Sequence, residues 1–151
     1  MYWKIFIRRY SSEIFPSPAL LHNATSPARG EGELQHDQQF LVINLNGQVF
    51  MEKQFEGAIA NPFLAIDKLL IDQGQKGDII IVDFHSEATS EKRGFGFYAD
   101  GRVSAVFGTH THVQTADAQL LSGGTAYISD TGMVGAADTV LGVSKDRALE
   151  Q

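Results

Sequence analysis

The stretch DIIIVDFH, at residues 78–85, decides the fold class of this 151-residue chain. Its apolar side chains follow one another without alternation, which is typical of a strand that is covered on both faces. The stretch VSAVF, at residues 103–107, has the same character, and we expect Gly108 to end it. Two buried strands of this kind predict a layered fold in which they are neighbours in one sheet.

Helices and hairpins are predicted around these two strands. Apolar side chains recur at helical spacing over residues 62–73, directly after Asn61, which is a favourable N-cap. Residues 89–98 form a second, shorter predicted helix, which two internal glycines weaken. The succession of strands and helices therefore predicts an α/β fold.

Two tight hairpins make the predicted sheet a mixed one. Asn46-Gly47 is the preferred pair for a two-residue turn, and we expect it to join strands at 39–45 and 48–51. A Ser-Gly-Gly turn joins Leu120-Leu121 to a strand at 125–129. Upstream, prolines and glycines punctuate residues 1–37, which predicts an irregular N-terminal segment. Residues 38–151 are then a single domain, which we expect to be truncated at both ends.

Composition excludes several classes of function. Hydrophobic residues make up 43% of the chain and charged residues 20%, as in an ordinary globular domain. A net charge of −6 gives no electrostatic reason to expect duplex nucleic acid or an anionic membrane as a partner. Cysteine is absent, which excludes disulfides, thiolate metal sites and cysteine nucleophiles, and we expect a cytoplasmic protein. The sequence has no apolar run of about 18 residues, as a membrane-spanning helix would need.

Three histidines follow the two best strands. His85 comes directly after the first, and His110 and His112 come just after the second. Ligand sites of α/β sheets lie beyond the carboxyl ends of the strands, so we expect the three imidazoles to converge at one edge. Asp83 and Glu87, two residues either side of His85, are candidates to accept the other ring N–H of a metal-ligating histidine.

The alternatives to a metal site stay open on the residues alone. A single histidine at a strand end is most often an ordinary polar surface residue. Imidazole and carboxylate ligands without cysteine favour zinc, manganese or iron. Three histidines suit a mononuclear zinc site, whereas a bimetal site needs further ligands, usually bridging carboxylates. Asn23 beside His22 is the nearest upstream candidate for such a motif, and it is a weak one.

Three longer stretches carry a resemblance to a known family: DFHSEATSEK at 83–92, DGRVSAVFGTHTHVQTAD at 100–117 and GTAYISDTGM at 124–133. Together they resemble the C-terminal half of the YmdB-like bacterial metallophosphoesterases. These belong to the calcineurin-like superfamily and are described as cyclic-nucleotide phosphodiesterases. The resemblance is dense from about residue 78 to 143 and looser from 39 to 77.

The resemblance implies a four-layer α/β/β/α sandwich with two divalent metal ions, Mn, Fe or Zn, at the strand ends. It implies that His85 and His110 bind one ion and that His112 binds the other. The expected reaction is hydrolysis of a small phosphodiester, such as a cyclic nucleotide, by metal-activated water.

The chain departs from the family in its upstream motifs. The family's Asp, Glu-Asn and Asn-His motifs, which supply the bridging carboxylate and the acid histidine, have no match here. No catalytic acid is therefore assigned, and we expect one metal ion in this chain. The alternative is a catalytically inactive metal-binding remnant, or a binding module that another polypeptide completes. The sequence does not give the oligomeric state.

Overall fold

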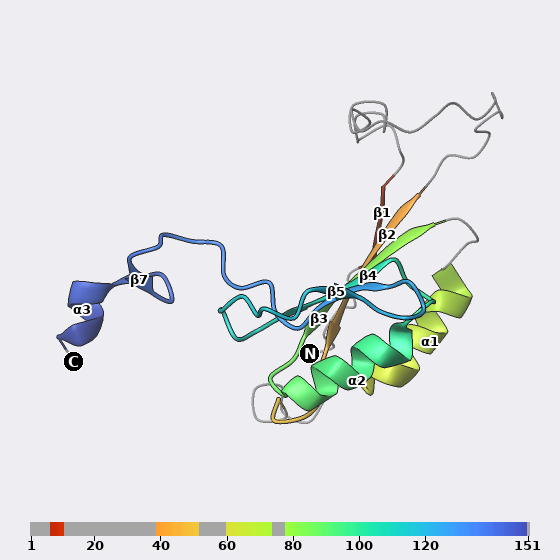
Figure 1. The fold of residues 1–151 in the computed structure, drawn as a ribbon, viewed down its shortest axis with the longest axis horizontal. Helices are drawn as coiled ribbons and strands as arrows, with labels where there is room; N and C mark the ends of the chain where they lie inside the picture. The colour runs from red at the N-terminus through yellow and green to blue at the C-terminus, as the bar shows by residue number, and fades with distance from the viewer. Residues whose placement is uncertain (1–6, 11–38, 52–59, 74–77, 151) are drawn as a thin grey trace.

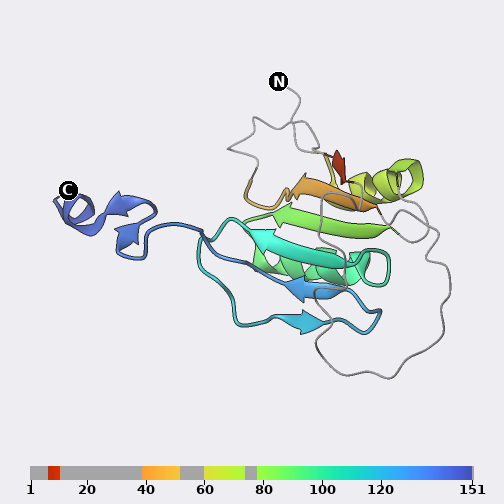
Figure 2. The ribbon, with the colours of Figure 1, turned by 90° about the horizontal axis from the view of Figure 1, so that it is seen from above.

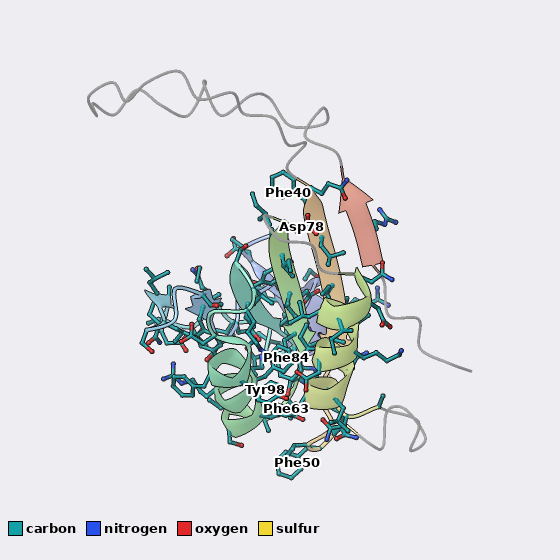
Figure 3. All side chains as sticks on the ribbon, turned by 90° about the vertical axis from the view of Figure 1, so that its right-hand side faces the viewer. Phe40, Phe50, Phe63, Asp78, Phe84 and Tyr98 are labelled. Atoms are coloured by element: carbon teal, nitrogen blue, oxygen red, sulfur yellow. The ribbon has the colours of Figure 1, made fainter. Side chains whose placement is uncertain are left out.

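The computed structural model describes residues 7–10, 39–51, 60–73 and 78–150. These residues form a mixed α/β fold around a six-stranded sheet, in the order β1-β2-β3-β4-β6-β5. Helices α1 and α2 lie side by side on one face of this sheet (Figures 1 and 3). The α/β class and the mixed sheet that the sequence predicts are thereby confirmed.

The central strands of the sheet are parallel. In sheet order the strands are β1 (Ile7–Tyr10), β2 (Phe40–Asn46), β3 (Ile79–His85), β4 (Ala105–Thr109), β6 (Ala126–Ile128) and β5 (Gln119–Leu120). Strands β2, β3, β4 and β6 run parallel, whereas β1 and β5 pair antiparallel at the two edges. The predicted pairing of the two buried strands is confirmed. In this register Asn46, His85 and Thr109 lie in one row, so β2, β3 and β4 end at the same edge.

Helix α1 (Pro62–Gln73) begins as the sequence predicts. The side-chain oxygen of Asn61 accepts the backbone N–H of Phe63 at 2.9 Å, which satisfies one of the free donors of the first turn. Helix α2 (Thr89–Ala99) contains the two glycines that were expected to weaken it. Gly96 is needed for packing, because the ring of Tyr127 in β6 lies where a Cβ would be.

An aromatic cluster holds the helices on the sheet. Phe84 of β3 stacks on Phe95 of α2 with 4.2 Å between ring centroids, and Phe63 of α1 meets Phe95 edge-on at 5.7 Å. Tyr98 closes the cluster, 5.2 Å from Phe63 (Figure 3). The side chains of β2, β3 and β4 alternate, so that one face of the sheet is buried and the other is half-buried.

A small C-terminal unit extends away from the sheet. It consists of the hairpin of β7 (Thr139–Val140) and β8 (Val143–Ser144), followed by α3 (Lys145–Leu149). This unit lies on the side toward which β2, β3 and β4 point (Figure 2). No helix among the described residues is long and apolar enough to cross a membrane.

The predicted hairpin at residues 39–51 is wrong. Strand β2 pairs with β1 and β3, and the residues after it do not fold back as a strand. The N–H of Gly47 donates instead to the carbonyl of His85 at 2.8 Å, and the N–H of Gln48 to the Glu91 carboxylate at 2.8 Å. These distant partners replace the hydrogen bonds of a local turn. The second predicted hairpin, formed by β5 and β6, is confirmed.

Two further corrections concern element boundaries. Gly108 does not end β4 but lies inside it. Glycine is needed at this position because the carbonyl of Ser129 occupies the space of a Cβ. Within the segment 1–37, predicted to be irregular, Ile7–Tyr10 form β1 on the free edge of β2. The other residues of that segment lie outside those described.

Candidate functional site at the strand ends

The candidate site is a hollow at the edge where β2, β3 and β4 end. It has a volume of 590 Å³ and is lined by His85, Glu87, His110, Thr111, His112 and Leu141. The three histidines that the sequence singles out therefore line the same hollow. Five of the six lining residues lie at or just after the ends of β3 and β4, and the sixth, Leu141, lies in the turn of the β7–β8 hairpin.

His85 and His110 are in direct contact. The Nε2 atom of His85 lies 3.2 Å from Nδ1 of His110, and the two rings meet edge-on with 4.9 Å between centroids. On its other side, Nε2 of His110 contacts the Glu87 carboxylate. Glu87, a candidate from the sequence to accept the ring N–H of a metal-ligating histidine, thus contacts His110.

A row of hydrogen bonds behind His85 fixes its tautomer. The Thr109 hydroxyl donates to Asp83 at 2.9 Å, and Asn44 donates its amide N–H to the other Asp83 oxygen at 2.7 Å. Since the hydroxyl hydrogen goes to Asp83, the Thr109 oxygen accepts from Nδ1–H of His85, 3.0 Å away. The lone pair of His85 is therefore on Nε2, the nitrogen that faces His110.

Asp83 acts through Thr109, and within the part of the chain that the structure describes it makes no direct hydrogen bond to a histidine ring. This corrects the expectation that Asp83 accepts the ring N–H itself. Thr109 and Asn44 were both missed from the sequence. The available signal for Asn44 was a polar side chain within the otherwise apolar stretch FLVINL, at residues 40–45. Asn44 pairs with Asp83 across β2 and β3.

Burial affects the protonation of His85. Loss of solvent lowers the pKa of its imidazole below the usual 6.5, and the neighbouring His110 lowers it further. The same two effects favour the neutral ring, which is the form that can bind a metal ion.

The backbone of the loop that carries His110 and His112 is unusual. Both residues have positive φ, 121° and 65°, in a region that residues other than glycine rarely adopt. The N–H of Thr111, between them, donates to Asp130 at 2.9 Å. The carbonyl of His112 accepts the N–H of Met133 at 3.1 Å. Such a conformation persists only where surrounding contacts determine it, and it is frequent at functional sites.

Comparisons with known proteins show the family of this chain. A family model described as "YmdB-like protein" matches residues 17–151. The chain belongs to this family. The match begins upstream of residue 39, where the resemblance seen in the sequence starts.

Proteins similar to this chain include a phosphodiesterase and two proteins of solved structure. The chain is 46% identical over 114 residues to a 2',3'-cyclic-nucleotide 2'-phosphodiesterase of Bacillus subtilis, covering 76% of this chain and 41% of that protein. It is 41% identical to a hypothetical protein from Thermus thermophilus, with a TM-score of 0.65, covering 75% of this chain and 42% of the other. A crystal structure of a novel phosphatase from Mycoplasma pneumoniae is 36% identical with a TM-score of 0.59, covering 74% of this chain and 38% of the other. The chain thus spans about two fifths of the length of these proteins.

Proposed function

We propose that this chain contributes to a metal-dependent phosphodiesterase that hydrolyses small phosphodiesters, with cyclic nucleotides as the substrate class. The observation that carries the proposal is the contact between His85 and His110, with a fixed lone pair on His85. The name of the Bacillus subtilis relative supports the reaction, and the solved phosphatase supports the chemistry of phosphate esters.

The His85–His110 pair fits a metal ion in the spacing of its nitrogens. Two nitrogens that share a tetrahedral zinc ion lie about 3.3 Å apart, since Zn–N bonds are about 2.0–2.1 Å long. The observed distance between the two imidazole nitrogens is 3.2 Å. Within the described ranges, no group of three or more histidine and carboxylate side chains is arranged to hold a metal ion. The described residues therefore offer two nitrogen ligands for one metal ion, from His85 and His110. His112 is proposed as a ligand of a second ion.

The surrounding residues prepare the pair for a cation. Asn44, Asp83 and Thr109 hold the His85 ring with its lone pair toward the hollow. His110 faces the lone pair of His85 with its Nδ1 atom and the Glu87 carboxylate with its Nε2 atom. A carboxylate that accepts the Nε2–H of His110 would leave the lone pair of its Nδ1 atom available for a cation shared with His85.

The proposed chemistry is that of a bimetal phosphoesterase. Manganese, iron or zinc, when bound, would supply Lewis acidity toward a phosphoryl oxygen and make a neighbouring water more acidic. The half-buried face of the sheet, opposite α1 and α2, supports the proposal of a further layer on that face, as in a four-layer sandwich. We place residues 38–151 in one domain of that enzyme.

The test is calorimetric titration of the chain with Mn²⁺ and Zn²⁺, together with hydrolysis of bis(p-nitrophenyl) phosphate and 2',3'-cyclic AMP. We expect saturable metal binding that is lost in His85→Ala and His110→Ala. His22→Ala and His36→Ala, at positions outside the described residues, are the controls and should bind as the parent does. Unchanged affinity in the first two variants would contradict the site. Metal binding without turnover would favour the inactive binding module.

A further inference from the structure

An ion pair is buried beneath the candidate site. The Lys92 ammonium lies 2.8 Å from the Asp130 carboxylate, and the two side chains are only 3% and 1% exposed. Removing two charges from water is costly, and a pair of apolar side chains often stabilises a core equally well. The presence of this buried ion pair is therefore better explained by the backbone groups that Lys92 and Asp130 bind than by a contribution to stability alone.

Both partners hold the backbone of the histidine loop. The Lys92 ammonium also donates to the carbonyl of Thr109 at 2.8 Å. The same Asp130 oxygen that accepts from Lys92 accepts the N–H of Thr111 at 2.9 Å. These two anchored residues lie on either side of His110.

The second Asp130 oxygen ties down the neighbouring strand end. It accepts the N–H of Gly132 at 2.9 Å, and Met133 next to it donates to the carbonyl of His112. Burial opposes ionisation of Asp130, but the hydrogen bonds from Lys92 and the backbone outweigh it and lower the carboxyl pKa to about 2. The loop is thus fixed at three successive points while His110 and His112 adopt positive φ.

We propose that Lys92 and Asp130 are positioning residues, whose ion pair holds the loop 109–112 in the conformation that directs His110 toward His85. Neither side chain lines the hollow, so both act through the loop. The inference rests on the proposed function, because the loop is positioned for metal binding. Loss of the Lys92 charge frees the carbonyl of Thr109, and loss of the Asp130 charge weakens the hold on the N–H of Thr111. In either case the loop then relaxes from its strained backbone conformation.

The test compares Lys92→Met with a surface control in the same chain. Methionine keeps a long unbranched side chain and removes the ammonium. The control is Lys68→Met, because the Lys68 side chain is 78% exposed and pairs with Asp72 one turn away. Two quantities are measured: the ring ¹⁵N chemical shifts of His85 and His110 in metal-free chain, and the Zn²⁺ dissociation constant.

We expect Lys92→Met to change the ring shifts of both histidines and to weaken Zn²⁺ binding about tenfold or more, while Lys68→Met changes neither. A folded Lys92→Met with parental ring shifts and a Zn²⁺ affinity within about twofold of the parent would overturn the proposal. If circular dichroism shows that this variant does not fold, Asp130→Asn decides by the same two readouts.

One measurement needs no variant. In the parent chain the N–H of Thr111 should exchange slowly with solvent, because it donates to the Asp130 carboxylate, a side chain that is only 1% exposed. Exchange at the rate of an unprotected amide would also overturn the proposal. Failure of the parent chain to bind Zn²⁺ would instead refute the proposed function, and the ring shifts in metal-free chain would still decide the positioning role.

Discussion

Replacing Thr109 by valine tests the link between Asp83 and His85. Valine keeps the volume of threonine and its fit in a strand, but it removes the hydroxyl that accepts from His85 and donates to Asp83. Two hydrogen bonds are lost, each worth about 0.5–1.5 kcal/mol, so we expect the free energy of unfolding to fall by about 1–3 kcal/mol.

The larger consequence is for His85 itself. Without the Thr109 oxygen, Nδ1–H of His85 has no acceptor in its present position, and the ring is free to change tautomer or orientation. Removal of a group that orients a metal-binding histidine commonly weakens affinity by about 10–100-fold, which corresponds to about 1.4–2.8 kcal/mol. We therefore expect the Zn²⁺ dissociation constant of Thr109→Val to rise by that factor.

Calorimetric titration with Zn²⁺ measures the affinity, and ¹⁵N spectra of the imidazole ring report the tautomer. Thr125→Val is a matched control, because the Thr125 hydroxyl also makes two hydrogen bonds, donating to the carbonyl of Val103 and accepting the N–H of Gly101, before the start of β4 and away from the histidine pair. A parental affinity in a folded Thr109→Val, with the Nδ1–H tautomer of His85 unchanged, would show that the hydrogen-bonded row does not orient the ring.

Three other outcomes follow from the packing and charges. Gly96→Ala should lower the free energy of unfolding by about 1–3 kcal/mol, because the ring of Tyr127 in β6 fills the space of the added Cβ. Gly94→Ala, whose added Cβ would have its nearest atom at 4.0 Å, should be neutral or stabilising, and thermal melts distinguish the two variants. The Asp130 carboxyl has a folded pKa of about 2 against an ordinary 3.8, so its contribution is complete above about pH 4 and is lost as pH falls toward 2; acid titrations of parent and Asp130→Asn should differ in that window. Glu91→Ala removes the acceptor of two backbone amides after β2, so amide exchange in the loop 47–51 should accelerate, and an unchanged rate would contradict this role.

Local signals were sufficient for most of the sheet and both of its helices. The runs at β3 and β4 contain consecutive apolar residues, and Asn61 caps α1 through its own side chain. The convergence of His85 and His110 followed from one topological rule, that parallel strands end at the same edge. These features depend on neighbours in the sequence or on strand direction alone.

The missed features depend on partners far along the chain. The Asn46-Gly47 pair is a good local turn, but the carbonyl of His85 and the carboxylate of Glu91 compete for the same backbone donors. Lys92 and Asp130 are 38 residues apart, and nothing in either local sequence marks them as a buried pair. Charged side chains are normally assigned to the surface, so a sequence pattern does not identify those that are buried and satisfied by each other.

Two adjacent residues of α2 hold loops from opposite sides of β3. Glu91 accepts the backbone amides of the loop after β2, and Lys92 donates to the last carbonyl of β4. Because both side chains leave the same helical turn, neither loop is able to move far without straining the attachment of the other. We expect the edge of the sheet to open as one cooperative unit when the first turn of α2 unwinds, with amides near Gln48 and Thr111 becoming accessible together. The start of this helix would then control the mobility of the whole rim around the histidines.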